Sequence, residues 1–414
     1  MGSKTNHQGT LLRLALLINM LSVGTLMMIM PLGPDLVRDI GLAGEQVGLI
    51  SGGATLGSAL IGFLLAPYLD KFDRKKSLVF FLVSRSVFIL LCSWSESPVQ
   101  LIVVFVIAGC FSGPLNGLVM ASVIDATRVE ERGRAMAFVA SGFSLAAILV
   151  VPVSLLIAQY SSWQMAFILS GVLGLVLAGI LQLCFPKLSQ PQQNTTQASG
   201  SLSQPSQGLK AMVLSLPFAL SIAMTSIAIF GHFLLVPNIS TYFQFNLSFP
   251  REEISYLYFF GGIASILAMR WSGKLLDRGF LISTFSSLTL LVIAVVYTGF
   301  VYQPNSVLIY VIFILFMASS SARSAMVSAV VSRCPPPQFR AAFMSYQSTA
   351  SNVAAGLASV VSSLYLSTAS NHQLQGIDEL AGLTILCSLV IPVIAICFLI
   401  SLQNQRARMQ QKQP

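Results

Sequence analysis

Apolar residues in this 414-residue chain occur in long runs rather than in short amphipathic patterns. A helix needs about 20 apolar residues to cross the roughly 30 Å hydrocarbon core of a bilayer. Because backbone polar groups cannot face lipid unpaired, such runs predict membrane-spanning helices. The pattern predicts twelve of them, approximately over 11–31, 45–67, 77–94, 99–124, 135–158, 163–185, 211–237, 252–273, 280–301, 305–331, 340–367 and 380–402.

The composition supports this prediction. Hydrophobic residues make up 55% of the chain and charged residues only 9%, whereas an ordinary soluble domain carries about 25% charged residues. The polar segments between some neighbouring runs are short, as at 95–98 and 159–162, so these neighbours are expected to be antiparallel hairpins. We therefore expect an all-α, multi-pass integral membrane protein surrounded by the lipid bilayer.

One polar segment is longer than the others. From 187 to 210 the chain consists mainly of Ser, Gln, Pro, Asn and Thr, a composition typical of a flexible linker. It separates six predicted helices from six. The sequence thus predicts an N-terminal six-helix bundle over 1–186, a linker over 187–210, a C-terminal bundle over 211–404 and a tail over 405–414.

The net charge of +9 has a regular placement. All but four of the 23 Lys and Arg residues fall at alternate ends of the predicted helices, on one side of the membrane. Arg38 and Arg251 lie on the opposite side, and Arg85 and Arg323 lie within helices. By the positive-inside rule the basic side is cytoplasmic, so both termini and the linker are expected in the cytoplasm. This placement explains the charge without a nucleic-acid partner.

Three landmarks of the first half recur in the second half, 206 or 207 positions later. An acid–base pair follows helices two and eight, a basic residue opens helices five and eleven, and a proline ends helices one and seven. The pairs are Asp70-Lys71 with Asp277-Arg278, Arg134 with Arg340, and Pro31 with Pro237. Two bundles in the same membrane orientation are a plan on which secondary transporters build a central binding site.

The chain resembles the major facilitator superfamily in three features. These are two sets of six predicted helices, a polar cytoplasmic linker, and a Gly-x-x-x-Asp-Arg-type signature after helices two and eight. The second copy consists of Gly273, Asp277, Arg278 and Gly279, and the first of Asp70, Lys71, Arg74 and Lys75, with Ala66 where a glycine is usual. The resemblance implies that these loops form a cytoplasmic gating motif. It also implies that Arg74 pairs with an acid at the end of helix four, where this chain has Asp125.

The expected gating role has a physical basis. An Asp at the cytoplasmic end of helix two can interact with the partly positive N-terminus of a helix from the other half, and its basic neighbours can pair with acids. Such contacts exist in one conformation and break in the other. The alternative is that these charges only mark the loops.

Ionisable residues inside the membrane are costly, so each is a functional candidate. Arg85 lies in helix three, His232 in helix seven and Arg323 in helix ten. In the superfamily helices one, four, seven and ten line the cavity, so the resemblance favours Arg323 and His232, whereas Arg85 has the alternative of bonding backbone carbonyls. Polar side chains add further candidates, which could instead serve helix packing: Asn19, Asn116, Gln347 and Asn352.

All fourteen carboxylates fall at helix ends or in loops. A buried Asp or Glu is the usual proton carrier of a pump or antiporter. Proton coupling would therefore use Asp35, Asp125 or His232, whose unperturbed pKa suits a proton switch. The alternatives are a uniporter or an exchanger of one substrate for another.

The stretch 141–167 is similar to the helix-five and helix-six signatures of bacterial drug and sugar exporters. Export of a drug or metabolite by a proton-coupled antiporter in the bacterial inner membrane is therefore the first hypothesis. Uptake or exchange of a small organic anion attracted by Arg323 is the second, and transport of a neutral metabolite is the third. A membrane enzyme or receptor is a remote alternative, because no metal-ligand spacing or phosphate-binding loop is present. No cofactor is expected, and a monomer is expected to be sufficient.

Overall fold

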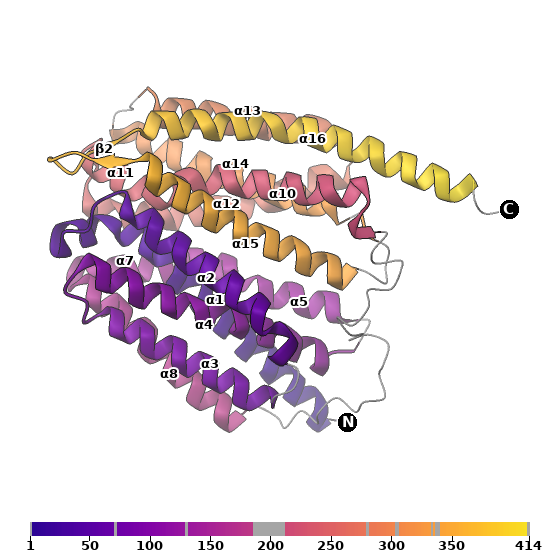
Figure 1. Ribbon diagram of the computed structural model, residues 1–414, viewed down its shortest axis with the longest axis horizontal. Helices are drawn as coiled ribbons and strands as arrows, with labels where there is room; N and C mark the ends of the chain where they lie inside the picture. Colours follow the sequence, from indigo (N-terminus) through magenta and orange to yellow (C-terminus); the bar gives the residue numbers. More distant parts are fainter. Residues whose placement is uncertain are drawn as a thin grey trace. The chain divides into compact units, whose positions relative to one another are not determined.

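The computed structural model describes residues 2–69, 73–128, 131–184, 212–278, 281–302, 306–332, 334–335 and 340–411. Long helices account for most of these residues, as the hydropathy pattern predicts (Figure 1). By its internal contacts the chain divides into two compact units. Unit 1 consists of Met1–Gly200, Pro237–Phe259 and Thr368–Leu374, and unit 2 consists of Ser201–Val236, Phe260–Ser367 and Gln375–Pro414.

Unit 1 contains the N-terminal helices. Within it, α2 packs along α4, and α3 packs between α4 and α8, while α1 contacts several neighbours and the short α11. Helix starts carry local capping signals: Ser97 accepts a hydrogen bond from the Gln100 amide and precedes a proline at the first helical position. The helices are α1 (Gly2–Ile40), α2 (Gln46–Leu69), α3 (Arg74–Cys92), α4 (Pro98–Ala126), α8 (Trp163–Cys184) and α11 (Ile239–Phe245).

The fifth predicted helix of unit 1 is interrupted. A π-helical turn covers Ala146–Val150, just before Pro152, which has no amide proton for the regular ladder. Gly24 of α1 lies against this turn, and a Cβ at that glycine would come within 2.6 Å of Val150. The segments are α5 (Arg132–Ala140), α6 (Gly142–Leu145), η2 (Ala146–Val150) and α7 (Val151–Tyr160).

Unit 2 is organised around α10, which packs on α15 and α16, while α13 packs on α14 and α16. α10 starts at a capping serine, Ser215, followed by a proline in its first turn. η3 and α12 each begin in one unit and end in the other. The elements are α10 (Leu216–Leu235), η3 (Val236–Asn238), η4 (Arg251–Glu253), α12 (Ile254–Asp277), α13 (Leu281–Phe300), α14 (Ser306–Val331), α15 (Arg340–Tyr365) and α16 (Ile377–Gln411).

These elements agree with the twelve predicted spans. When α5 to α7 are taken as one span and α10 with α11 as another, the described part of the chain contains twelve long helical segments. Ten of them are long and apolar enough by hydropathy to cross a membrane. α3 and α15 are more polar, because α3 carries a basic first turn and Arg85, and α15 is rich in serine. The predicted linker over 187–210 lies outside the described residues.

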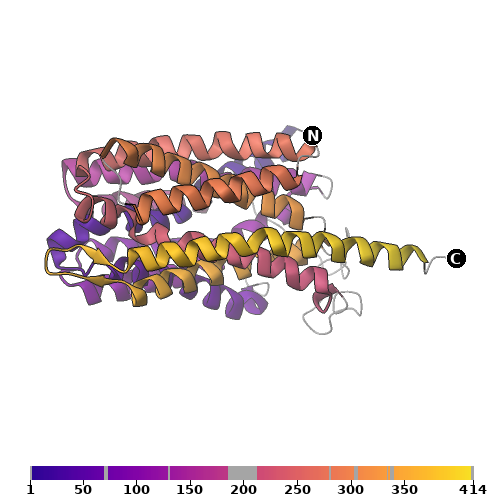
Figure 2. The same ribbon diagram turned by 90° about the horizontal axis from the view of Figure 1, so that it is seen from above.

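A small β-hairpin departs from the predicted all-α class. Its strands are β1 (Ser367–Thr368) and β2 (Leu374–Gln375), between α15 and α16. His372 lies in the turn with a φ of 65°, and Gly376 follows β2 with a φ of 86°. The predicted helix to 367 is therefore two residues too long, since α15 ends at Tyr365. Figure 2 shows the hairpin leading directly into the long yellow helix α16, which continues to Gln411.

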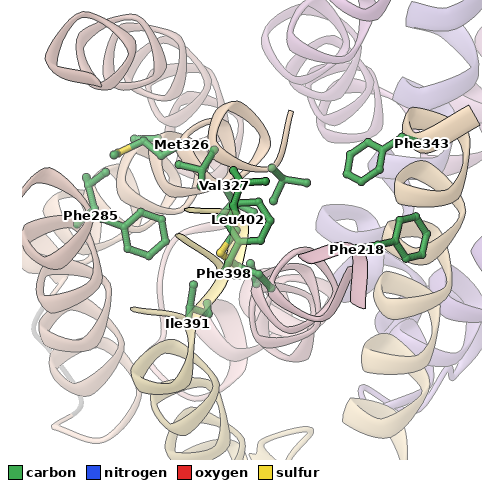
Figure 3. Close-up of a cluster of buried hydrophobic side chains, with 14 of the residues drawn as sticks. Phe218, Phe285, Met326, Val327, Phe343, Ile391, Phe398 and Leu402 are labelled. Atoms are coloured by element: carbon green, nitrogen blue, oxygen red, sulfur yellow. The ribbon is translucent and has the colours of Figure 1, made fainter. Parts of the chain in front are cut away.

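Each unit has its own apolar core. In unit 1 the core joins α1, α3, α4, α5 and α8 around residues such as Leu78, Leu115 and Leu181. In unit 2 it joins α10, α13, α14, α15 and α16, and Figure 3 shows Phe285, Val327 and Phe398 among its buried side chains. In a bilayer the hydrophobic effect does not drive helices together, because lipid tails are as apolar as the side chains. Close side-chain packing between helices therefore stabilises each core.

Glycines bring α2 and α4 into close contact. A Cβ at Gly113 would lie 1.9 Å from the carbonyl oxygen of Ser58, and one at Gly109 would lie 2.5 Å from the carbonyl oxygen of Ala54. Small residues allow this approach of two backbones in a membrane. The backbones of α2 and α4 are therefore in tight contact within unit 1.

Candidate functional site

Arg323 is a buried cation in α14 with incomplete hydrogen bonding. Its side chain is 2% exposed. One guanidinium nitrogen, Nη1, donates to the hydroxyl of Ser388 in α16 at 2.8 Å. Its Nε is enclosed and has no hydrogen-bond partner among the described residues. None of the ion pairs found among those residues includes Arg323. An unpaired charged donor is costly in this setting, so the position can accept an anion.

Other unpaired groups surround Arg323. Phe316, Ser320 and Arg323 follow at i, i+4 and i+7 and therefore share one face of α14. His232 of α10 stacks on Phe316, with ring centroids 5.3 Å apart and an interplanar angle of 18°. The Ser320 hydroxyl and the His232 Nδ1 are enclosed and have no hydrogen-bond partner in the described part of the chain. We call Arg323, His232, Ser320, Phe316 and Ser388 the Arg323 cluster; all five belong to unit 2.

Arg85 has different surroundings in unit 1. It is 1% exposed, and its Nε donates to the Ser112 hydroxyl of α4 at 2.9 Å. Its Nη2 donates to the backbone carbonyl of Ser22 in α1, also at 2.9 Å. Arg85 thus joins three helices, which is the structural alternative that the sequence left open for it.

The remaining predicted pathway residues have individual surroundings within their own units. Gln347 of α15 is buried and donates to the Thr225 hydroxyl of α10 at 2.9 Å. Asn352 is exposed, and the side-chain oxygen of Asn19 lies beside Gly142. The side-chain oxygen of Asn116 is enclosed without a hydrogen-bond partner among the described residues. Within unit 2, only His232 and Arg323 of the predicted residues come together in one cluster.

In the first copy of the predicted gating motif, Arg74 and Asp125 lie together. The Nε of Arg74 is 3.3 Å from the Oδ2 of Asp125, as the resemblance leads us to expect. Arg74 is the first residue of α3, and Asp125 lies in the last turn of α4. Asp70 and Lys71 fall outside the described residues.

In the second copy, the backbone continues as a helix to Asp277, the last residue of α12. The Arg278 amide donates to the Lys274 carbonyl at 3.2 Å, which extends the final turn. A Cβ at Gly273 would meet no atom within 4 Å among the described residues.

An ion pair that the sequence analysis did not predict lies in unit 1, at the end that the charge pattern places outside. Arg251 of η4 donates from Nε and Nη2 to the two carboxylate oxygens of Asp35 in α1, both at 2.7 Å. The side chains are 13% and 16% exposed. Bidentate pairs of this kind are among the stronger polar contacts in proteins.

A second contact lies beside this ion pair. Arg38 donates to the side-chain oxygen of Gln244 at 2.8 Å and lies over the ring of Phe245, 5.1 Å from its centroid. We call Asp35, Arg38, Gln244, Phe245 and Arg251 the outer cluster. Arg38 and Gln244 are 206 positions apart, which is the offset of the sequence repeat. The contact therefore joins equivalent positions beyond the ends of the first and seventh predicted helices.

The β-hairpin is held at the same end of unit 1. Asn246 donates from Nδ2 to the Leu374 carbonyl at 2.8 Å, and its side-chain oxygen accepts from the Leu374 amide at 2.9 Å. The Thr368 hydroxyl donates a hydrogen bond to the carboxylate of Glu45. The signal for this region was present in the sequence: Arg38 and Arg251 are the two basic residues predicted on the side that otherwise lacks Lys and Arg.

Comparison with known proteins identifies the family. The family model described as "Major Facilitator Superfamily" matches residues 14–359 of the chain, which is most of its length. The chain belongs to the major facilitator superfamily. The twelve long helical segments of the described residues agree with this membership.

Curated members of the superfamily match parts of the chain. A hexuronate transporter of Bacillus subtilis (strain 168) is 26% identical over 199 residues, 48% of this chain and 47% of that protein. A gallate transporter of Pseudomonas putida is 22% identical over 177 residues, 42% of this chain and 39% of that protein. The chain thus spans about half the length, or less, of the curated relatives it matches.

A solved structure of the superfamily matches nearly the whole chain. It is a bacterial homologue of the human lysosomal transporter Spinster, in an inward-facing and unoccupied conformation. The TM-score is 0.73, with 13% identity, and the match covers 96% of this chain and 97% of that one. At this identity the likeness shows the fold alone.

Proposed function

We propose that this superfamily transporter carries a small organic anion, with Arg323 as the residue that binds the carboxylate. The observation that carries the proposal is the unpaired Nε of the buried guanidinium. The named relatives support the choice of an anion, because hexuronate and gallate are both carboxylates near neutral pH. A carboxylate supplies the negative charge and the acceptor oxygens that Arg323 lacks.

Arg323 suits this role better than Arg85. Ser388 holds one side of its guanidinium and leaves Nε directed elsewhere, so the orientation is fixed before an anion arrives. At Arg85, by contrast, a hydroxyl and a carbonyl from two other helices already accept from Nε and Nη2. Binding an anion at Arg323 would offset the cost of the buried charge, which makes the interaction strong despite burial.

We propose uptake or exchange as the mode of transport. In the described part of the chain, Asp35 pairs with Arg251 and Asp125 lies beside Arg74, which supports a mode of transport without a carboxylate proton carrier. Export remains the second candidate, and it is favoured by the exporter-like stretch 141–167. The bacterial relatives favour a bacterial inner membrane, and a monomer contains both units.

Alternating access requires contacts that form and break at each side of the membrane. We propose the outer cluster as the latch on the outside and the Arg74–Asp125 pair, with the two signature loops, as part of the latch on the cytoplasmic side. The outer cluster supports this assignment because it ties α1 to α11 and η4. Loss of the outer cluster would release the end of α1 from α11.

Counterflow in proteoliposomes tests the substrate class. Vesicles containing the full chain are loaded with unlabelled glucuronate, gallate, glucose or ethidium and given the same compound in labelled form outside. We expect accelerated exchange of the carboxylates, and none of glucose or ethidium. Exchange of ethidium alone would overturn the anion proposal in favour of export of drugs. Parallel runs with a pH gradient and an uncoupler establish whether carboxylate accumulation depends on protons.

A further inference from the structure

The Ser320 hydroxyl differs from several other serine hydroxyls in the helices of unit 2. A serine in a membrane helix ordinarily donates to a carbonyl one turn earlier. Its neighbour Ser319 does so, bonding the Leu315 carbonyl at 2.6 Å, and Ser351 and Ser359 follow the same pattern. Ser320 is equally buried but has no hydrogen-bond partner among the described residues. Its donor and acceptor capacity is therefore available to a bound molecule.

His232 offers a second such group on the opposite helix. Stacking on Phe316 fixes the plane of the imidazole, and its Nδ1 has no partner in the described part of the chain. The residue is only partly buried, whereas Arg323 is almost fully enclosed. Depending on its tautomer, a neutral imidazole nitrogen can donate to or accept from a hydroxyl group.

The two unpaired groups lie near the cationic one. Ser320 precedes Arg323 by three residues on the same helix, so the two side chains are neighbours. His232 stacks on Phe316, which shares one face of α14 with Ser320 and Arg323. One charged donor and two uncharged hydrogen-bonding groups therefore converge between α10 and α14.

Resting on the proposed function, we infer that the Arg323 cluster selects carboxylates that also carry hydroxyl groups. Arg323 binds the carboxylate, and Ser320 and His232 bind hydroxyl groups of the same molecule. A site with buried polar groups discriminates against an analogue that lacks the matching hydroxyl, because the group is then left unpaired. The substrate class is thus hydroxylated monocarboxylates, such as sugar acids and hydroxybenzoates, rather than simple carboxylic acids.

Binding to the purified full chain in detergent tests this selectivity. The thermal unfolding midpoint is measured against increasing benzoate, 4-hydroxybenzoate, gallate, cyclohexanecarboxylate, glucuronate and glucose, and the dissociation constants are derived from the shifts. We expect gallate to bind about 10-fold or more tighter than benzoate, as two hydrogen bonds would give. Glucuronate should likewise bind about 10-fold or more tighter than cyclohexanecarboxylate. Glucose, which lacks a carboxylate, should not bind.

Variants assign the selectivity to the two groups. Ser320→Ala and His232→Phe, which keeps an aromatic ring on Phe316, should each reduce the preference for gallate over benzoate to about 3-fold or less. Ser319→Ala is the matched control, because that hydroxyl bonds its own helix, and it should retain the full preference. If Ser320→Ala fails to fold, Ser320→Cys is measured in its place. Ser320→Thr keeps a hydroxyl group and should therefore retain the preference for gallate.

The outcomes separate this inference from the proposed function. Equal binding of benzoate and gallate by the wild type would overturn the hydroxyl selectivity and leave anion transport standing. Equal weakening of both compounds by Ser320→Ala and His232→Phe would likewise overturn it, because it would indicate a purely structural role. If no carboxylate bound at all, the proposed function would fail as well.

Discussion

At the residue scale, Arg85 and Arg323 are two buried arginines with different hydrogen bonding. Both are at most 2% exposed and both lie within membrane helices. Arg85 donates hydrogen bonds to two other helices, whereas Arg323 donates to one and its Nε has no partner among the described residues. We assign Arg85 to the stability of unit 1 and Arg323 to anion binding.

This assignment predicts opposite effects on stability. Arg85→Gln should lower the thermal unfolding midpoint in detergent, because two hydrogen bonds to a charged group contribute about 1.5–3 kcal/mol each. Arg323→Gln should leave the midpoint unchanged or raise it, since it removes a buried charge with incomplete partners. An equal loss of stability in both variants would contradict the distinction.

Sequence reasoning finds the ionisable members of the site but not the others. His232 and Arg323 could be singled out because ionisable groups are costly in a bilayer. Ser320 and Ser388 could not, because serine is frequent in these helices and usually bonds its own backbone. Only the structure shows which hydroxyl is left without a partner.

At the element scale, the close packing of α2 on α4 gives a direct prediction. Gly113→Ala should destabilise unit 1 strongly, because its Cβ would meet the Ser58 carbonyl oxygen at 1.9 Å and the backbones would have to separate. Gly117→Ala in the same helix is the matched control, with no atom within 4 Å of the new Cβ among the described residues. Thermal unfolding in detergent compares them; similar midpoints would show that the contact is not tight.

The outer cluster predicts a change in accessibility. Asp35→Asn or Arg251→Gln should open the outer helix ends and raise the labelling rate of Ser240→Cys by an impermeant maleimide about tenfold, as loss of roughly 1.4 kcal/mol would give. Ser240 is buried beside Pro31, to whose carbonyl it donates. Exposed Asp39, changed to Asn, is the control and should have no effect. The exchange Asp35→Arg with Arg251→Asp should restore slow labelling; a latch role is wrong if the single variants label at the wild-type rate.

Element prediction succeeds where apolar runs are long. Hydropathy predicts the twelve spans, since lipid imposes a minimum length on each. It does not predict β1 and β2, because two-residue strands in a polar loop leave no periodic pattern. The outer ion pair joins Asp35 to Arg251, far apart in sequence, so only the fold brings them together.

At the scale of the whole molecule, the boundary given by the sequence repeat differs from the boundary between the two units defined by contacts. The repeat separates six helices from six, whereas unit 1 also includes Pro237–Phe259 and Thr368–Leu374 of the second half. The outer end of the seventh predicted helix thus shares contacts with α1 in this structure. These are contacts that alternating access would have to break.

The cytoplasmic signature predicts an effect on turnover. Asp70→Asn and Asp277→Asn should each lower the maximal transport rate more than they change substrate affinity, because a latch acts on the conformational step. Initial uptake rates over a range of glucuronate concentrations separate the two quantities. Wild-type maximal rates in both variants would contradict the gating role of the signature.

The central claim is that the charge of Arg323 binds the carboxylate of the transported molecule. The most direct test is counterflow of labelled glucuronate in proteoliposomes containing the wild type or Arg323→Gln, with protein amount and orientation matched. The account predicts rapid exchange by the wild type, at least a tenfold slower exchange by Arg323→Gln and partial recovery in Arg323→Lys. Exchange by Arg323→Gln at the wild-type rate would contradict it.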